Sequence, residues 1–240
     1  MNEKDTTFIV SHLDFMIDFE TIGLLADSAP MSVACLPFFR NNVNTPFWPD
    51  DGLITHSIDD LRDPFTTFTA YVDLRSCVVD GFRFDQQTID WWSHRTPFQK
   101  RSVCKELPEP LTDVLAGLLN YLSRTIVTYE ARSVCLWSQG SEMDIAMLKH
   151  IASLYGADLE KIIPYTSYRD CRTLVLEAAM ATSYKINYDA NILENPKLAY
   201  NLIPPLPDEF GSADNVHDAL YDCFRSAWST WIALKWLKKQ

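Results

Sequence analysis

The chain has 240 residues, a formal net charge of −11 and an aromatic content of 12%. This length can bury one full hydrophobic core, and the aromatic content excludes disorder as the overall state. No stretch approaches the roughly 18 uncharged apolar residues of a membrane-spanning helix, and no signal peptide is recognisable at the start. We therefore expect a soluble cytoplasmic protein.

The seven glycines and six cysteines exclude several kinds of site. The closest glycines are Gly140 and Gly156, whereas a dinucleotide fingerprint or a phosphate loop needs glycines only a few residues apart. The cysteines form no CxxC pair, so a cysteine zinc site has no nucleus. We expect them to be reduced and mostly buried.

The first half of the chain predicts strands followed by short helices. A Pro- and Asp-rich stretch, 40–65, is expected to be a surface excursion. Thr96 followed by Pro97 is typical of an N-cap and a first helical residue. The predicted strands are 15–19, 31–38 and 68–74, and the predicted helices are 86–94 and 97–105.

The second half alternates helices with one further strand. Ser141 and Asp144 have the spacing of a capping box at a helix start. The predicted helices are 111–122, 172–182 and 215–237, the strand is 133–137, and the Pro-rich tract 187–213 is an irregular loop. Strands first, then strands alternating with helices, predict an α/β fold with a mixed central sheet flanked by helices.

Two carboxylates occupy an unfavourable place in the first predicted strand. If the strand continues through Asp18 and Glu20, their side chains share one face, roughly 7 Å apart. Two such charges repel each other and are costly to desolvate, and a divalent cation relieves both costs. The alternative is that the strand ends at Phe19 and the acids cap a turn.

Asp144 shares a helix face with Leu148 and Ile151, which places it on the buried side of its predicted helix. The alternative is an acid that is favoured at the N-terminus by the helix dipole.

Asp222 lies one turn into the last predicted helix, between the small residues Ala219 and Ser226. These small side chains let the helix approach the sheet closely. Five helical residues turn by roughly 140°, so His217 and Asp222 converge only if His217 lies in or beside the preceding loop. The alternative for His217 is a cap or a surface group.

Three short motifs resemble those of the DEDDh 3′–5′ exonucleases, the DnaQ-like branch of the ribonuclease-H-like fold. DFET resembles the first motif, DxET, and GSEMDIAML resembles the second, an aspartate that opens a helix after a strand. HDALYD resembles the third motif, HxAxxD, of the histidine-bearing subgroup. Spacing and order agree with the family in all three.

A closer resemblance extends over about residues 14–235. IDFETIG, TIDWW, RDCRT and HDALYDC are similar to the exonuclease A of T-even bacteriophages and the related bacterial 3′–5′ exoribonuclease family. Ile22 departs from the family pattern, because many relatives have Thr-Gly after the ET pair. This departure is expected to alter only a contact to the terminal nucleotide. The resemblance implies one ribonuclease-H-like domain over 1–240, acting in the host cytoplasm if phage-encoded. A homodimer is compatible with it, but the oligomeric state stays open.

The resemblance also implies a two-metal nuclease. The four acids Asp18, Glu20, Asp144 and Asp222 would hold two Mg²⁺ or Mn²⁺ ions, and hard carboxylate oxygens suit those ions. His217 would take the proton of the attacking water. The products would be nucleoside 5′-monophosphates, released from the 3′ end of single-stranded or 3′-ended nucleic acid. No motif tests for a 2′-hydroxyl, so DNA and RNA both remain candidates.

Further residues are candidates for substrate binding: Thr21, Trp91, Trp92, Arg169 and Arg172. Trp91 and Trp92 precede an acid-free run, 94–105, which suits base stacking beside phosphate contacts. The alternative is that one of the two tryptophans belongs to the core. Arg169 and Arg172 match the family stretch RDxRT and could contact the scissile strand, or Arg172 could pair with Asp170.

Two other classes of function compete with a nuclease. A catalytically inactive nucleic-acid-binding or regulatory module could share the fold, although all five motif residues are present here. An acidic decoy that mimics DNA would need long acidic arrays, and the sequence has none.

Overall fold

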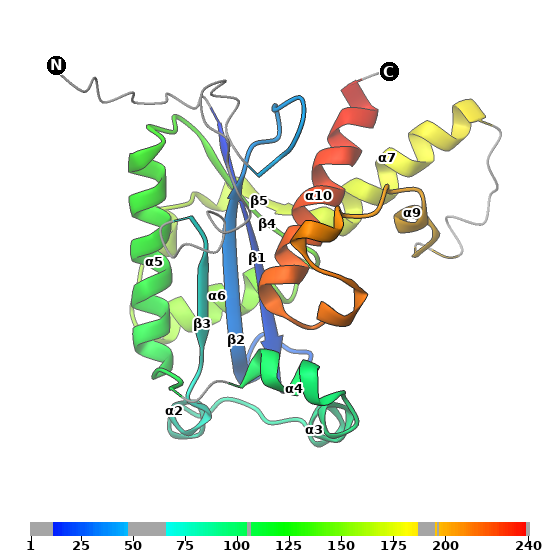
Figure 1. The fold of residues 1–240 in the computed structure, drawn as a ribbon. Coiled ribbons are helices and arrows are strands. Elements are labelled where there is room, and N and C mark those ends of the chain that lie inside the picture. The colour runs from blue at the N-terminus through cyan, green and yellow to red at the C-terminus, as the bar shows by residue number, and fades with distance from the viewer. Residues whose placement is uncertain (1–11, 48–65, 105–106, 187–194, 196, 239–240) are drawn as a thin grey trace, which may run out of the picture.

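The computed structural model describes residues 12–47, 66–104, 107–186, 195 and 197–238. They form a five-stranded mixed sheet flanked by helices, consistent with a ribonuclease-H-like exonuclease fold (Figure 1). The predicted fold class is therefore confirmed. No helix in the described ranges is long and apolar enough to cross a membrane.

The sheet is built around its first strand. The strand order is β3-β2-β1-β4-β5, in which β1 pairs antiparallel with β2 and parallel with β4. The strands are β1 (Leu13–Thr21), β2 (Pro30–Phe38), β3 (Phe68–Tyr71), β4 (Val134–Ser138) and β5 (Tyr168–Asp170). Since β1 is central, its side chains lie under helices on both faces.

β1 continues beyond Phe19, so Asp18 and Glu20 both belong to the strand. They pair with Ala34 and Ser32 of β2, and the register shifts only between Glu20 and Thr21. The alternative in which these acids cap a turn is therefore excluded.

Of the helices that follow β3, the three short ones lie beyond the end of β1, and the long one runs along the sheet (Figure 1). Thr96 caps α4 with a capping box to Gln99, and Pro97 is its first residue, as predicted. The predicted strand 68–74 is too long, because Asp73 accepts a hydrogen bond from the backbone of Arg75 and starts a helix. The helices are α2 (Leu74–Val79), α3 (Gln86–Ser93), α4 (Pro97–Val103) and α5 (Leu111–Thr128).

The second half of the chain contains four further helices. They are α6 (Asp144–Leu154), α7 (Cys171–Ile186), α9 (Lys197–Asn201) and α10 (Ala219–Lys238). α10 begins later than the predicted residue 215. The tract 187–213 is not wholly irregular, because it contains α9 and a short 3₁₀ turn, Asp208–Phe210. Residues 187–194 of that tract, and 48–65 of the predicted excursion, lie outside the described residues.

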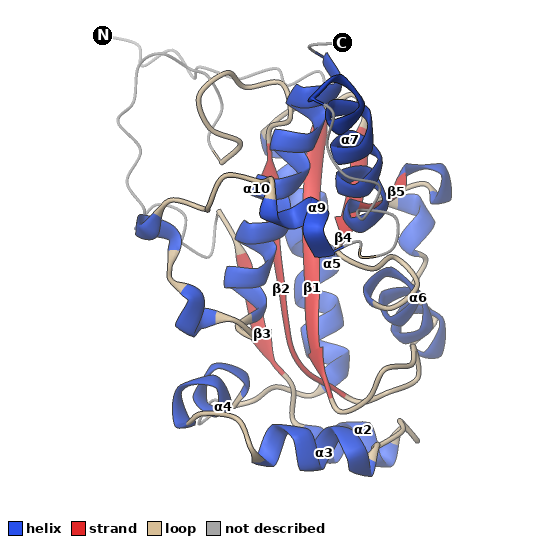
Figure 2. Cartoon of the chain, turned by 90° about the vertical axis from the view of Figure 1, so that its right-hand side faces the viewer, coloured by secondary structure: helices blue, strands red, loops and turns tan. Residues whose placement is uncertain are grey.

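Two apolar clusters cover the two faces of the sheet. The odd-numbered residues Leu13, Phe15 and Ile17 pack with α5 and α6. Met16 packs with residues of α7 and α10 on the opposite face. Figure 2 shows α7 and α10 in front of the sheet and α5 behind it. Because side chains alternate along a strand, the even-numbered acids of β1 share the face that α7 and α10 cover.

The six cysteines are free, and all except Cys104 are buried.

Candidate active site

Four carboxylates from three elements converge near the C-terminal end of β1. Asp18 and Glu20 project from β1, Asp144 is the first residue of α6, and Asp222 lies in the first turn of α10. Glu20, Asp144 and Asp222 are less than 9% exposed. Buried acids without matched cations are unfavourable, so this cluster needs a chemical explanation.

Asp144 ties α6 to the central strand. Its Oδ1 accepts a hydrogen bond from the backbone N–H of Phe19 over 3.2 Å. The predicted capping box from Ser141 to Asp144 is wrong, because α6 begins at Asp144, and Met143, its N-cap residue, makes no side-chain cap bond. The Asp144 carboxylate therefore lies against β1 and does not take part in a capping box.

His217 lies in the loop before α10, where its backbone has a left-handed φ of 72°. Its N–H donates to Asp222 Oδ2 over 2.9 Å, and Arg225 Nη1 donates to Asp222 Oδ1 over 2.7 Å. Potential ligand atoms of Glu20, His217 and Asp222 all lie within 4.8 Å of one another. The loop position therefore brings His217 and Asp222 together, as the helix geometry required.

The pKa values of the acids report their crowding. Burial, and then the charges of Asp144, Glu20 and Asp222, raise the pKa of Asp18 well above its ordinary value. Burial followed by Asp222 raises the pKa of Glu20 to about 9. Burial raises the pKa of Asp144 to about 7, although the hydrogen bond from Phe19 opposes this shift. The shifts of Asp18 and Glu20 mean that the charges of neighbouring acids are not balanced by nearby cations, whereas the shift of Asp144 reflects its burial.

This arrangement fits a divalent cation. Three of the four acids have raised pKa values, because of burial in all three and also because of like charge at Asp18 and Glu20, and a bound cation would oppose both effects. The donors are carboxylate oxygens with one imidazole beside them, a set that suits Mg²⁺ or Mn²⁺. Asp18, Glu20, Asp144 and Asp222 are the residues that could hold such ions.

Two tryptophans from α3 surround the His217 ring. The ring centroids of Trp91 and Trp92 lie 4.8 Å and 5.9 Å from the centroid of the imidazole, and both pairs are edge-on. Burial lowers the pKa of His217, and the charge of Asp222 partly opposes this. An imidazole with a lowered pKa is neutral near pH 7 and can accept a proton.

A pocket of about 450 Å³ opens beside the acids. Its lining includes Glu20, Thr21, Trp91, Trp92 and His217. A pocket of this size that is lined by aromatic rings and borders the carboxylates can accept one nucleoside unit.

The two tryptophans have different environments. Trp92 is 8% exposed, and its Nε1 donates to the carbonyl of Thr21 over 3.0 Å, so it supports the end of β1. Trp91 is 38% exposed and carries the Arg95 guanidinium 4.1 Å from its ring centre. The Thr21 hydroxyl donates to Gly23 O over 2.6 Å. Of the two rings, Trp91 is the one open to a ligand.

Arg169 and Arg172, the two arginines predicted to bind substrate, have different surroundings. Arg169 Nη1 donates to the carbonyls of Thr166 and Tyr168, which holds its own turn. Arg172 packs beside Gly140, and its charge lowers the pKa of Asp144 against the larger effect of burial. Arg172 therefore lies near enough to influence the acid cluster, whereas no contact among the described residues joins Arg169 to it.

The pairing of Arg172 with Asp170 is not found among the described residues. Asp170 accepts hydrogen bonds from the backbone N–H groups of Ser141 and Thr173, over 2.8 Å and 2.7 Å. These bonds join the loop before α6 to the start of α7.

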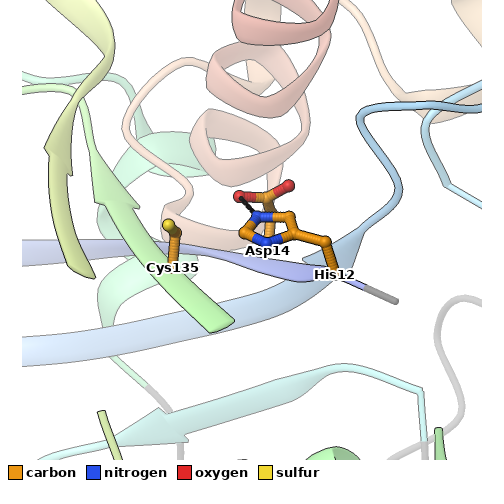
Figure 3. Close-up of side chains that lie close together, drawn as sticks. All are labelled: His12, Asp14 and Cys135. Atoms are coloured by element: carbon orange, nitrogen blue, oxygen red, sulfur yellow. Dashed lines mark hydrogen bonds and ion pairs between the residues drawn. The ribbon is translucent and has the colours of Figure 1, made fainter. Parts of the chain in front are cut away.

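A second group with potential ligand atoms lies at the other end of β1. His12, Asp14 and Cys135 have such atoms within 4.8 Å of one another (Figure 3). However, the Asp14 carboxylate already accepts two bonds from Arg40 and one from Trp137 Nε1 at 2.6 Å. Its charge is matched and its oxygens are occupied, so this group is a closed ion-pair network and does not suit a cation.

Residues 13–201 match the model of the 3′–5′ exoribonuclease Rv2179c-like domain. The chain belongs to this family. The resemblance to a 3′–5′ exoribonuclease family is therefore confirmed, and the match indicates 3′–5′ exoribonuclease activity, a nuclease hydrolase with a nucleic acid substrate. No curated protein matches the chain. The matched range includes Asp18, Glu20 and Asp144 and ends before His217 and Asp222.

Two contacts of this site escaped the sequence analysis. Arg225 follows Asp222 by three residues, and Arg95 follows Trp91 by four. The spacing of Asp222 and Arg225 places both side chains on one helical face, so this signal was present in the sequence. It was ambiguous because nothing in the local pattern shows that this face points toward the acids. Arg95 lies in the bend beyond the end of α3, where helical spacing gives no signal.

Proposed function

We propose that this protein is a metal-dependent 3′–5′ exoribonuclease that releases nucleoside 5′-monophosphates from the 3′ end of RNA. The observation that carries the proposal is the convergence of Glu20, His217 and Asp222 within 4.8 Å, beside two more acids with raised pKa values. The family match supports the reaction class and the polarity of degradation.

The four acids would hold two divalent cations. Asp18 is the central ligand in this proposal, because the charges of all three other acids raise its pKa. Glu20 and Asp222 would complete one ion site, and Asp144 the other. When bound, the two cations would stabilise the charge that develops on the phosphate and on the departing 3′ oxygen.

His217 would act as the general base. Its lowered pKa leaves the imidazole neutral near pH 7, and an imidazole nitrogen would take the proton of the attacking water. Asp222 holds the His217 backbone by its N–H, and Arg225 fixes the opposite carboxylate oxygen. These two contacts orient the base relative to the acids.

The pocket beside Trp91 would receive the terminal nucleoside. Stacking of a base on an exposed aromatic ring contributes about 1–3 kcal/mol. Thr21 would contribute its hydroxyl oxygen as an acceptor, since the hydroxyl hydrogen is donated to Gly23 O. Arg172 would contact the phosphate strand, and Trp92 would support the pocket floor. Arg169 lies outside this proposal because its guanidinium is bound to its own turn.

Cleavage of 5′-labelled single-stranded RNA and DNA of one sequence tests the proposal. With Mg²⁺ or Mn²⁺ we expect a ladder that shortens from the 3′ end, faster for RNA than for DNA. Excess chelator should abolish the ladder, and adding back Mg²⁺ should restore it. No zinc requirement is expected from a carboxylate site. Full activity in excess chelator would refute the two-metal mechanism.

The same experiment separates an inactive binding module from an enzyme. A module that only binds would retard the labelled RNA in a gel without shortening it, whatever the divalent ion. A substrate blocked by a 3′ phosphate serves as the control, because an enzyme that needs a free 3′ end should leave it intact.

A further inference from the structure

We propose that α4 positions the catalytic loop through two side chains, Gln99 and Ser102, which hold the backbone carbonyls of Val216 and His217. This inference rests on the proposed function, in which His217 is the general base. Gln99 and Ser102 are positioning residues, since they act through His217 and not on substrate.

Gln99 connects the start of α4 to the loop. Its Oε1 accepts from Thr96 N over 3.1 Å, which closes the capping box, and its Nε2 donates to Val216 O over 3.2 Å. One end of the amide therefore fixes the helix while the other holds a carbonyl 117 residues away in the sequence. An amide can accept at one end and donate at the other, whereas an ionised carboxylate can only accept.

Ser102 holds the next carbonyl of the loop. Its Oγ lies 2.9 Å from His217 O and 2.8 Å from Gln99 O. The single hydroxyl hydrogen can donate fully to only one of these oxygens at a time, so Ser102 bridges the helix and the loop. Ser102 is buried, at 9% exposed. Burial keeps water from replacing this bond.

The His217 backbone needs such support. Its φ of 72° is a left-handed conformation that a non-glycine residue adopts only at a cost. α4 also packs against the 3₁₀ turn Ala213–Asn215 that leads into the loop. Together with the bond from His217 N–H to Asp222, the backbone of the base is therefore held on both sides.

The ring of His217 is directed by the backbone that α4 holds. α3 contributes the Trp91 and Trp92 rings around the imidazole, and α4 supplies the two backbone contacts. Loosening α4 should let the loop leave the left-handed conformation, which displaces the imidazole from Glu20 and Asp222. Misplacement by a fraction of an ångström is enough to slow a proton transfer.

Gln99→Glu is the sharpest variant, because the carboxylate keeps the acceptor of the capping box and loses the donor to Val216 O. We expect single-turnover cleavage to slow by about 3- to 10-fold with KM nearly unchanged, the scale of one lost positioning hydrogen bond. Ser102→Ala should act in the same direction. Ser123→Ala is the matched control, since its Oγ donates only within α5, over 2.9 Å to Leu119 O.

A double-mutant cycle with His217→Ala distinguishes positioning from other effects. If Gln99 acts through the base, Gln99→Glu should slow the wild type but leave the rate of His217→Ala unchanged. A change of equal size in both backgrounds would overturn the proposal. It would mean that the new charge or a general loss of stability acts on the metal site directly.

Hydrogen exchange gives a readout that does not depend on catalysis. In Gln99→Glu and Ser102→Ala, a peptide covering 212–222 should exchange faster, and in Ser123→Ala it should exchange as in the wild type. Unchanged exchange in both α4 variants would overturn the inference, whether or not RNA is cleaved. Absence of cleavage by the wild type would instead refute the proposed function alone.

Discussion

The two ends of β1 place carboxylates in opposite electrostatic environments. Asp14 and Asp18 are four residues apart on one face of the same strand. Although burial alone would raise the pKa of Asp14, hydrogen bonds from Arg40 and His12 hold it below its ordinary value. Burial and three neighbouring acids raise the pKa of Asp18 instead.

The difference between these two environments distinguishes a structural carboxylate, Asp14, from a candidate functional one, Asp18, on the same strand. At Asp14 the protein supplies matched donors from Arg40, Trp137 and His12, so the charge contributes to the folded state. Around Asp18, the one ion pair to an acid of the cluster among the described residues joins Arg225 to Asp222. A fold that leaves buried charges unmatched loses stability, and such clusters are typical of sites that bind a cation or perform catalysis.

Asp18→Asn is expected to have the largest effect on activity. Removing the central carboxylate should lower turnover by about 10³-fold or more, a usual scale for the loss of a central catalytic group. The same change relieves charge repulsion, so the melting temperature of the metal-free protein should rise. Cleavage kinetics and thermal unfolding on one preparation check both. Turnover at the wild-type rate would remove Asp18 from the site.

His217→Ala comes next in size. We expect a loss of roughly 10²- to 10⁴-fold in the single-turnover rate, the usual range for a general base. Metal affinity, measured by calorimetry, should change far less than in Asp18→Asn. If His217 only starts the last helix, the variant would instead lose up to about 1–2 kcal/mol of stability, as for a lost cap, and cleave nearly normally.

Asp14→Asn probes the matched end of the strand. An amide cannot accept the full set of donors from Arg40 and Trp137, and it leaves Arg40 without a counter-charge. We expect a loss of about 3–5 kcal/mol in the free energy of unfolding, as for a broken buried pair. Urea unfolding measures this loss. Asp14→Asn and Asp18→Asn should therefore shift stability in opposite directions, and shifts of the same sign would contradict the comparison.

Much of the acid cluster around Asp18 could be predicted from the sequence, because short motifs identified its residues. Asp18, Glu20, Asp144, Asp222 and His217 were named from three motifs, and the structure brings them together. Their catalytic roles remain predictions. Periodicity also located β1 to β4 and most helices, since one buried face is enough to set the pattern, but it did not predict the short strand β5.

Long-range contacts explain what the sequence did not predict. The capping box at Ser141 failed because Asp144 bonds Phe19, 125 residues away. Trp91 and Trp92 could not be told apart until Trp92 was found against Thr21. The network at Asp14 was missed as well, because Arg40 and Trp137 reach it from other strands and loops. No local pattern carries these pairings.

The smallest effect concerns pH and the matched end. The hydrogen bond to Asp14, with a further contribution from Cys135, raises the pKa of His12 from 6.5 to about 9. A raised histidine pKa contributes stability that is complete below pH 6.5 and is lost as the pH rises toward about 9. Because the imidazole is partly exposed, we expect this loss to be only about 1 kcal/mol.

His12→Gln keeps a hydrogen-bonding side chain that cannot titrate, so the loss of stability between pH 6.5 and about 9 should become smaller. Cys135 has a lowered pKa and opposes this trend, so both proteins should also carry Cys135→Ser. Glu20 loses its proton in the same window, but its contribution is common to both proteins and cancels in the difference. Urea unfolding at several pH values measures that difference. Parallel pH profiles would mean that Asp14 does not hold His12 in its protonated form. Arg40 and Trp137 alone would then stabilise the charge of Asp14.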